Sequence, residues 1–301
     1  MRKIIIIAGP TASGKSALAI KLAKKLNTEI ISADSMQIYK DMNIGTAKIT
    51  EKEMEGIKHH LLDVVNPNEE YSVSDYADAA KKIIDRLHSE NKIPIICGGT
   101  GLYIDSLLYP LSLGAKDDAV REKLQKECDE YGPSYMHQKL EKIDKAEADK
   151  VHENNVKRVL RALEIFELTG KTKSEQEDRN KDLIYDTLLI CLNPNRDELY
   201  HRINVRVDKM FKDGLEKEVR NLLNAGYTFD MQSMQAIGYK EFKDYFDGKI
   251  TKEFLMDEIK KGTRHYAKRQ LTWFKRYDFT KFFDINEDKK IINEIDEFIR
   301  K

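Results

Sequence analysis

Cysteine is scarce in this chain of 301 residues, which contains three, at Cys97, Cys128 and Cys191. Their odd number and wide spacing favour reduced, buried thiols over a disulfide framework or a zinc site. The sequence also lacks an apolar run of about eighteen residues and a basic-then-apolar leader. We therefore expect neither a membrane span nor export, and place the protein in the cytoplasm.

The sequence has no net charge either, since 52 lysines and arginines balance 52 aspartates and glutamates. No global field therefore favours nucleic acid. Locally, however, the segment from Lys260 to Tyr277 has no acidic residue and includes Tyr266, Trp273 and Phe274. Such a stripe suits a phosphate backbone with aromatic rings nearby, but a solvated helix face has the same pattern. Its basic residues are Lys260, Lys261, Arg264, Lys268, Arg269, Lys275 and Arg276.

What the sequence does have is a phosphate-binding pattern, GPTASGKS at residues 9–16, directly after the apolar run Ile4 to Ala8. Its glycines let the backbone fold around an anion, and N–H groups at the start of the next helix point at it. Lys15 supplies a charge for a terminal phosphate, and the Ser16 hydroxyl suits Mg²⁺. A glycine-rich turn that only caps a helix is the alternative. The predicted phosphate-binding residues are Gly9, Pro10, Thr11, Ala12, Ser13, Gly14, Lys15 and Ser16.

Strands alternate with amphipathic helices around this loop. Leu18, Leu22 and Leu26 recur every four residues and predict a helix that ends near Asn27. Further strands are predicted at 29–33 and 92–97, and between them Ser72 and Asp75 form the pattern of a capping box. The alternation predicts an α/β fold, a P-loop NTPase-like parallel sheet flanked by helices, with ligands beyond the carboxyl ends of the strands.

Strand signals stop in the middle of the chain, where no glycine occurs between Gly132 and Gly170. They return at Leu188 to Leu192, and the last helix carries an apolar stripe. We therefore predict a catalytic core of residues 1–114 and 184–301, with C-terminal helices, and an all-helical insertion of residues 115–183. The stripe of the last helix comprises Ile291, Ile292, Ile295, Phe298 and Ile299.

Two smaller features invite a functional interpretation. Lys157, Arg158 and Arg161 lie opposite an apolar helix face in the predicted insertion. The adjacent His59 and His60 could suggest a metal site, but neighbouring side chains diverge on a strand or helix, so we favour structural or substrate-edge roles.

The segment after the second strand, DSMQIYKDMNIGTAK at 34–48, places Asp34 beside the phosphate loop. Together with that loop it resembles the tRNA dimethylallyltransferase (tRNA isopentenyltransferase) family. The resemblance covers nearly the whole chain, and it is to the bacterial type, because Lys301 follows soon after the last helix without a zinc-finger extension. Its further segments are HHLLDVVNP (59–67), GGTGLYIDSLL (98–108), Arg121, KRVLRALE (157–164), TGKT (169–172), MQAIGYKE (234–241) and AKRQLTWF (267–274).

The resemblance implies transfer of a dimethylallyl group from dimethylallyl diphosphate to N6 of the adenosine immediately 3′ of the anticodon in tRNA. The phosphate loop, with Lys15, Mg²⁺ at Ser16 and Arg206, would then stabilise the leaving pyrophosphate. Asp34 is the expected base for the weakly basic amine. An aspartate after a strand could instead hold Mg²⁺ through water. Thr100 completes the expected catalytic group.

The acceptor base must leave the anticodon loop to react. The resemblance implies that Ser35, Gln37 and Thr100 contact the base and that Asp34 and Met36 also bind the tRNA. Gln37 has both a donor and an acceptor for an adenine edge. We expect a monomer, and the resemblance further implies that it holds the anticodon stem-loop through Arg121, Lys157, Arg158, Val159, Leu160, Arg161, Gly238, Tyr239, Lys240, Arg264, Lys268 and Arg269.

Two other classes remain open. A P-loop kinase of nucleosides or other small molecules would use the same loop for ATP, and would need mobile arginines around a transferred phosphoryl group. A regulatory RNA-binding protein would form no covalent product.

Overall fold

The computed structural model describes residues 1–110, 117–177 and 182–301. The chain folds into two compact units, one of residues 1–108 with 184–301 and one of residues 109–183. The boundary that we predicted at residues 114 and 115 lies outside the described residues.

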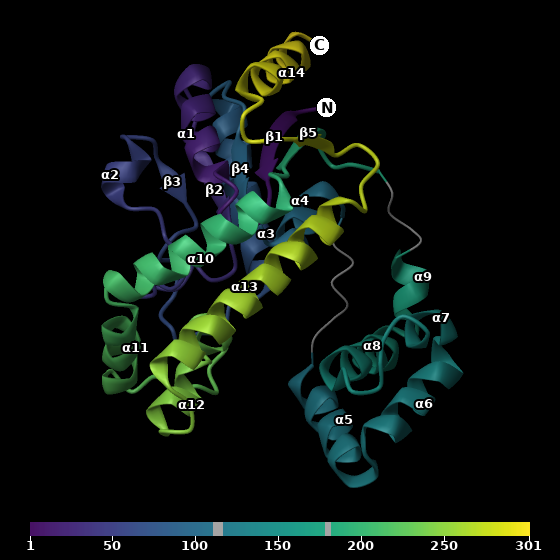
Figure 1. The fold of residues 1–301 in the computed structure, drawn as a ribbon. Helices are drawn as coiled ribbons and strands as arrows, with labels where there is room; N and C mark the ends of the chain where they lie inside the picture. Colours follow the sequence, from purple (N-terminus) through teal and green to yellow (C-terminus); the bar gives the residue numbers. More distant parts are fainter. Residues whose placement is uncertain (111–116, 178–181) are drawn as a thin grey trace. The chain divides into compact units, whose positions relative to one another are not determined.

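The first unit is built on one sheet of six strands in the order β3-β2-β4-β1-β5-β6, every pair of which is parallel (Figure 1). This confirms the predicted α/β fold. The sequence pattern missed β3 and β6, because strands of two or three residues are too short to show a periodic signal. The strands are β1 (Lys3–Ala8), β2 (Ile30–Ala33), β3 (His59–His60), β4 (Ile95–Gly98), β5 (Asp186–Leu192) and β6 (Lys281–Phe283).

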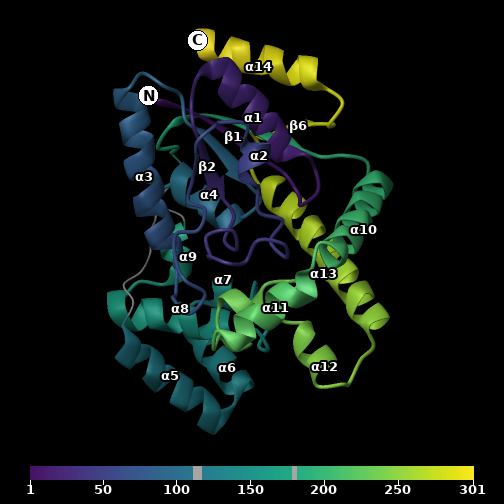
Figure 2. The same cartoon turned by 90° about the vertical axis from the view of Figure 1, so that its left-hand side faces the viewer.

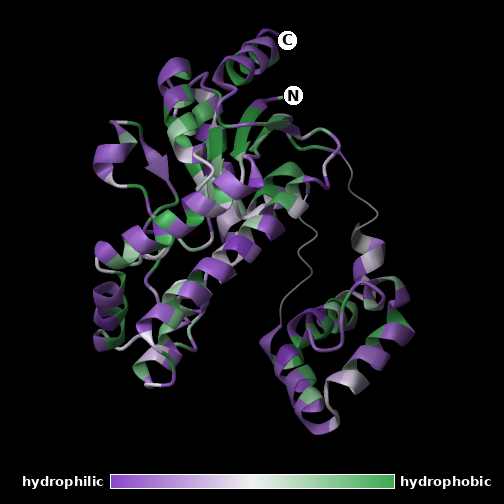
Figure 3. Cartoon of the chain, in the orientation of Figure 1, coloured by the Kyte–Doolittle hydropathy of each residue, from purple (hydrophilic) through white to green (hydrophobic). Residues whose placement is uncertain are grey.

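Strand β1 lies at the centre of the sheet, and its residues Ile4 to Ala8 have no exposed surface. A parallel strand covered on both faces is apolar throughout, which explains the unbroken run in the sequence. Figure 3 shows the central strands as the hydrophobic part of this unit. The helix α1 (Lys15–Leu26) ends, as predicted, at Asn27, which has a left-handed conformation.

Helix α14 (Asp288–Arg300) packs beside α1 against the same core cluster of the sheet, as Figures 1 and 2 show. Its predicted stripe is confirmed: Ile291 and Ile295 are fully buried, and Ile292, Phe298 and Ile299 are partly buried against the cluster.

The predicted capping box begins helix α3 (Val73–Ser89). Ser72 Oγ accepts a hydrogen bond from the Asp75 N–H, and Asp75 Oδ2 accepts one from the Ser72 N–H. The helix packs on α4 (Gly101–Leu108), where the rings of Tyr76 and Tyr103 stack with centroids 3.9 Å apart.

The carboxyl-terminal half of this unit is mainly helical, as predicted. Helices α10 (Arg196–Lys212) and α13 (Lys252–Phe274) lie side by side and share Leu199, Ile203 and Ala267 as a small core (Figure 2). The other elements of this unit are α2 (Glu51–Met54), α11 (Leu215–Asn224), the 3₁₀ turn Ser233–Gln235 and α12 (Phe242–Phe246).

The second unit is helical throughout its described residues. Leu124, Met136, Leu140 and Leu163 are fully or almost fully buried in its own core. Its helices are α5 (Asp118–Tyr131), α6 (Pro133–Ile143), α7 (Lys145–Ala148), α8 (Val156–Thr169) and α9 (Lys173–Glu177). In neither unit do the described residues form a helix long and apolar enough to cross a membrane.

Gly98 allows β2 and β4 to approach each other at their carboxyl ends. A Cβ atom at residue 98 would lie 2.2 Å from the carbonyl oxygen of Ala33. The neighbouring main chain belongs to the sheet and cannot move away without separating the two strands.

We expect Gly98→Ala to lower the free energy of unfolding by roughly 2 kcal/mol or more, because the added methyl group overpacks two backbones. Gly262 in α13 is the matched control, since its Cβ would meet Ile237 Cγ2 at an ordinary 3.5 Å. Gly262→Ala should be neutral or should stabilise by up to about 1 kcal/mol. Denaturant unfolding measures both changes, and a Gly98→Ala protein as stable as the wild type would contradict this view of the sheet edge.

Candidate active site

The phosphate loop joins the end of β1 to the start of α1. Gly14 precedes the helix with a φ of 88°, a left-handed conformation that favours glycine. A Cβ on Gly9 would lie 2.9 Å from Ser13 Oγ. Lys15 Nζ donates to the Pro10 carbonyl at 3.2 Å, so its ammonium group curls back over the loop. The residues predicted for phosphate binding therefore form one turn at the carboxyl edge of the sheet.

Three cations lie around this loop. Burial lowers the pKa of Lys15, and the neighbouring thiol of Cys97 and carboxylate of Asp34 only partly oppose this shift. Burial also lowers the pKa of Arg206, with the neighbouring Arg202 adding to the effect. Arg206 Nη1 lies 3.4 Å from Thr11 Oγ1, and Arg202 Nη1 lies 3.5 Å from the Ala12 carbonyl oxygen. A bound polyanion would offset the desolvation that disfavours these charges.

Asp34 directly follows β2, and its side chain is fixed by the next turn of the chain. Its Oδ1 accepts hydrogen bonds from the N–H groups of Met36 at 2.9 Å and Gln37 at 3.4 Å. Thr100, after β4, accepts from the Ser35 N–H at 3.0 Å and lies 3.3 Å from Ser35 Oγ. The ends of two neighbouring strands thus hold Asp34, Ser35 and Thr100 together.

A cavity of about 310 Å³ opens between these elements. Lys15 and Arg206 lie on its wall, as do the apolar side chains Ile203, Val207 and Ile259. It can therefore accommodate a ligand with an anionic end and an apolar part. The other lining residues are Thr11, Asp34, Ser35, Met36, Gly45, Thr46, Ala47, Met210, Gln235, Ala236, Ile237, Gly238, Lys240, Thr263, Tyr266, Arg269 and Gln270.

Tyr266 presents a neutral phenol to this cavity. Burial, together with the charge of Asp34, raises the pKa of Tyr266 to about 12. Its hydroxyl hydrogen-bonds with Thr100 and Gln270, whose contributions only partly oppose this rise. Sequence reasoning noted Tyr266 only as one aromatic residue of the basic stripe.

Gln270 is a site residue that the sequence analysis missed. Only 5% of its surface is exposed. Its Oε1 accepts from the Thr11 N–H of the phosphate loop at 3.0 Å, and its Nε2 donates to the Gly99 carbonyl at 2.9 Å. One sequence feature could have indicated this role. Gln270 is a polar residue on the side of α13 that faces inward, three positions after the buried Ala267 and four before the buried Phe274.

This geometry can be compared with that of known proteins. The family model described as IPP transferase matches residues 37–277. The chain belongs to the IPP transferase family.

Curated relatives cover the chain almost completely. A tRNA dimethylallyltransferase of Caldanaerobacter subterraneus subsp. tengcongensis is 50% identical over 305 residues, which cover 99% of this chain and 96% of the relative. One from Clostridioides difficile is 50% identical over 296 residues, with coverage of 97% and 95%. The phosphate loop precedes the matched family segment but lies within the range that the first relative covers.

Two solved structures extend this similarity. The tRNA isopentenylpyrophosphate transferase of Bacillus halodurans matches with a TM-score of 0.74 and 44% identity, covering 100% of this chain and 96% of the other. A eukaryotic dimethylallyltransferase acting on tRNA matches with a TM-score of 0.86 and 33% identity, covering 100% of this chain and 80% of the other. The family resemblance inferred from the motifs is therefore confirmed.

The basic residues of the stripe between Lys260 and Tyr277 fall into two groups in the structure. Lys261, Lys268 and Arg269 are exposed. Arg264 instead donates to Asn204 Oδ1 at 2.7 Å, and Lys260 pairs with Asp208 at 2.6 Å, so both join α13 to α10. The helix ends at Phe274, which places Lys275 beyond it.

Three of the residues predicted at the RNA surface have buried side chains. Val159 and Leu160 lie in the core of the second unit. Tyr239 is fully buried, and its hydroxyl donates to Glu218 Oε1 at 2.6 Å. These side chains face inward, whereas Gly238 and Lys240 line the cavity described above.

The basic residues of the second unit gather as predicted. Arg121, Lys157, Arg158 and Arg161 line one hollow of about 290 Å³, together with Lys173 and Glu164. Arg161 pairs with the buried Glu164 at 2.7 Å, and Arg158 lies 3.7 Å from the buried Glu147. The hollow therefore has a cationic surface, and the buried carboxylates of Glu147 and Glu164 lie beside two of its arginines.

For the histidine pair we favoured structural or substrate-edge roles, and the structure places His60 in a hydrogen-bonded group with Glu29 and Arg86. His60 Nε2 lies 2.5 Å from Glu29 Oε2, and Arg86 pairs with the same carboxylate. Burial opposes ionisation of Glu29, but the hydrogen bonds from Arg86 and His60 outweigh it and lower the pKa of Glu29 to about 2. Across residues 1–110, 117–177 and 182–301, no three potential ligands cluster as a metal site.

All three cysteines are buried and unpaired, as predicted. Cys97 lies beside the phosphate loop, and burial raises the pKa of its thiol to about 11 despite the nearby Lys15 and a hydrogen bond with Ser16. The thiol is therefore a neutral neighbour of the loop and not a nucleophile.

Proposed function

We propose that the chain transfers a dimethylallyl group from dimethylallyl diphosphate to N6 of the adenosine immediately 3′ of the anticodon in tRNA, and releases pyrophosphate. The observation that carries this proposal is the single cavity that Lys15, Arg206, Asp34 and apolar side chains line together. A diphosphate fits the cationic end, an allyl chain the apolar wall, and an acceptor amine the carboxylate.

The reaction breaks the bond between the allylic carbon and the diphosphate oxygen, and the electron pair leaves with pyrophosphate. Lys15, Arg206 and the loop N–H groups stabilise the charge that develops there. The adenine nitrogen forms the new bond to carbon and loses a proton. Asp34 accepts that proton, because its carboxylate is fixed at the edge where the cavity meets the end of β2.

We expect Mg²⁺ to bind at this site mainly through the phosphate oxygens of the substrate, with few ligands from the protein. The ion prefers oxygen ligands and usually keeps several waters while it binds substrate phosphates. Ser16, an exposed residue at the first turn of α1, offers a hydroxyl that hydrogen-bonds with Cys97, and the described residues offer no cluster of three acidic, histidine or cysteine ligands. Bound there, Mg²⁺ would neutralise part of the charge of the leaving group.

The acceptor adenosine leaves its stack to enter the cavity. Ser35 and Met36 line the cavity, and Thr100 binds Ser35. Gln37 binds two residues of the cavity wall: its Nε2 donates to the carbonyl oxygens of Thr46 and Ala47, which leaves Oε1 as the acceptor for an adenine N–H.

Basic surfaces on both units position the stem-loop through its phosphates. On α13 these are Lys268 and Arg269, and on the second unit they are the residues of the basic hollow. We place this activity in the cytoplasm, because free thiols suit a reducing compartment. We propose a monomer, because one chain supplies every residue of the site.

The direct test incubates the protein with dimethylallyl diphosphate labelled in its allyl group, unmodified tRNA and Mg²⁺. Label should enter tRNA at that adenosine, and pyrophosphate should be released in equal amount without ATP. An anticodon stem-loop with inosine at the acceptor position lacks the amine and should take up no label. Obligatory ATP hydrolysis, or label-free tRNA with phosphorylated nucleosides, would support a kinase instead.

We expect Asp34→Asn to reduce single-turnover transfer roughly 10²-fold or more while leaving tRNA affinity unchanged, because the amide keeps the shape and removes the base. Asp41→Asn, at an exposed residue of the same segment, is the control and should retain the wild-type rate. If excess Mg²⁺ restores the rate of Asp34→Asn, the carboxylate holds the metal and is not the base.

A further inference from the structure

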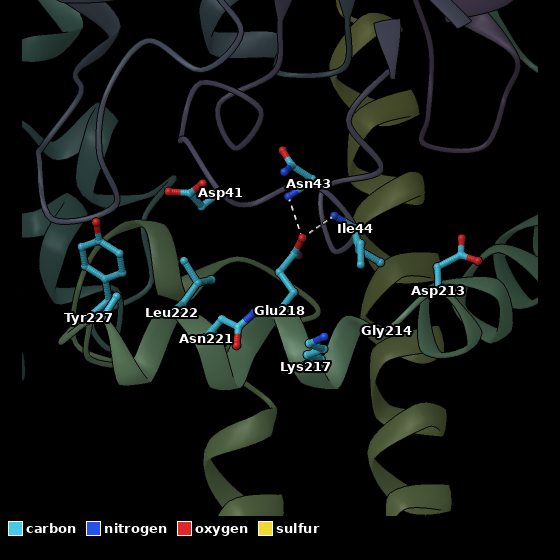
Figure 4. A pocket seen from close by; sticks show the side chains of 11 residues that line it. Asp41, Asn43, Ile44, Asp213, Gly214, Lys217, Glu218, Asn221, Leu222 and Tyr227 are labelled. Atoms are coloured by element: carbon cyan, nitrogen blue, oxygen red, sulfur yellow. Dashed lines mark hydrogen bonds between the residues drawn. The ribbon is translucent and has the colours of Figure 1, made fainter. Parts of the chain in front are cut away.

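Glu218 on α11 inserts its carboxylate into a loop within the segment 34–48, which begins with Asp34 (Figure 4). Its Oε2 accepts from the N–H groups of Asn43 at 2.9 Å and Ile44 at 2.7 Å. Its Oε1 accepts from the Gly45 N–H at 3.0 Å and from the Tyr239 hydroxyl at 2.6 Å. Hydrogen bonds to an ionised acceptor are short and strong, and here four donors share one carboxylate.

This arrangement leaves Glu218 no capacity for another partner. A carboxylate offers about four lone-pair sites, and four donors occupy them. A hollow of about 440 Å³ lies beside the residue, but Glu218 can bind neither a cation nor a ligand there without losing a main-chain contact. The role of Glu218 must therefore be sought in the loop that it holds.

The held loop, residues 43–47, forms part of the proposed base-binding cavity. Gly45, Thr46 and Ala47 line that cavity next to Ser35 and Met36. Gln37 holds the other end of the loop, because its Nε2 donates to the Thr46 carbonyl at 3.2 Å and the Ala47 carbonyl at 3.4 Å. The backbone of Gln37 in turn donates to Asp34 Oδ1.

Tyr239 contacts both the loop 43–47 and the carboxylate of Glu218. A Cβ on Gly45 would lie 2.4 Å from Tyr239 Cε2, so the ring packs directly on the loop backbone. Tyr239 is buried, and burial together with the charge of Glu218 raises its pKa well above the ordinary value. The phenol therefore stays protonated and remains a donor to the carboxylate. Gly45, Glu218 and Tyr239 form one clamp from three distant segments.

We propose that Glu218 is a positioning residue for the acceptor base. It touches no substrate, but through the loop 43–47 and Gln37 it sets the wall beside Asp34 and thereby the approach of the adenine amine to the carboxylate. This inference rests on the function proposed above and assigns Glu218 to the tRNA side of the site, not to the diphosphate side.

Glu218→Gln tests the clamp, because the amide turns an N–H group toward at least one of four donors. We expect kcat/KM for tRNA to fall by on the order of tenfold, and KM for dimethylallyl diphosphate to change less than about twofold. Glu216→Gln is the matched control on the same helix, since Glu216 binds Arg220 at 2.9 Å and Lys252 at 3.3 Å, away from the loop. It should behave as the wild type.

A double-mutant cycle with Gln37→Ala separates positioning from general destabilisation. If Glu218 and Gln37 hold one loop, kcat/KM for tRNA falls less in the double variant than the product of the fold-losses in the two single variants. Two outcomes would overturn the proposal. One is that the fold-losses in kcat/KM for tRNA simply multiply in the double variant; the other is that KM for dimethylallyl diphosphate rises as much as kcat/KM for tRNA falls. Tyr239→Phe keeps the carboxylate, removes one donor and should show a smaller loss of the same kind; it remains informative if Glu218→Gln fails to fold.

Amide hydrogen exchange tests the clamp without any activity. Glu218→Gln should accelerate exchange in residues 36–48 while Glu216→Gln does not, and unchanged exchange would overturn the proposal. If exchange accelerates but the wild type transfers no label to tRNA, the proposed function fails and the acceptor role of Glu218 fails with it. If the wild type is active and Glu218→Gln transfers normally, only the role of Glu218 is refuted.

Discussion

The site depends on one buried amide group. Gln270 joins the phosphate loop at the Thr11 N–H to the turn after β4 at the Gly99 carbonyl, and it does so from α13. Leaving such a buried donor or acceptor unpaired costs about 1–3 kcal/mol, so the two loops and the helix constrain one another. The glycines make this possible: a Cβ on Gly99 would lie 2.0 Å from Gln270 Nε2, and one on Gly101 2.3 Å from Trp273 Cδ1.

The same helix therefore serves both substrates of the proposed reaction. Lys268 is exposed on a surface suited to RNA phosphates, Arg269 is exposed and also lines the cavity, and the next residue, Gln270, faces the phosphate loop. Arg206 also reaches Thr11 of that loop, from α10, which packs against α13. Both helices contribute residues to the wall of the cavity, so the geometry of the proposed site does not rely on a loop alone.

Local patterns predicted much of this structure from the sequence. The phosphate loop, the capping box at Ser72, the helix end at Asn27 and the central strands depend on neighbouring residues, and all are found where predicted. The strands β3 and β6 were missed because so few residues carry no periodicity. A family resemblance named Tyr239, Val159 and Leu160 as RNA contacts, but their burial is set by packing with residues far away in the sequence.

Gln270 and Glu218 could not be assigned a role from the sequence for the same reason. Each binds main-chain groups more than 170 positions away, and a polar residue in a helix gives no sign of such a partner. Only the positions of Gln270 between Ala267 and Phe274 in α13, and of Glu218 between Leu215 and Leu222 in α11, indicated that these side chains face inward, because residues three and four positions apart share one side of a helix.

The affinity of the Gln270→Ala variant for inorganic pyrophosphate tests this account most directly. Thr272→Ala is the control, because Thr272 is exposed on the same helix and its hydroxyl donates to the Lys268 carbonyl within that helix at 3.0 Å. Titration calorimetry should show affinity reduced by on the order of tenfold for Gln270→Ala, since the loop loses its buried support, and no change for Thr272→Ala. Wild-type affinity in Gln270→Ala would contradict the claim that this amide holds the phosphate loop in place.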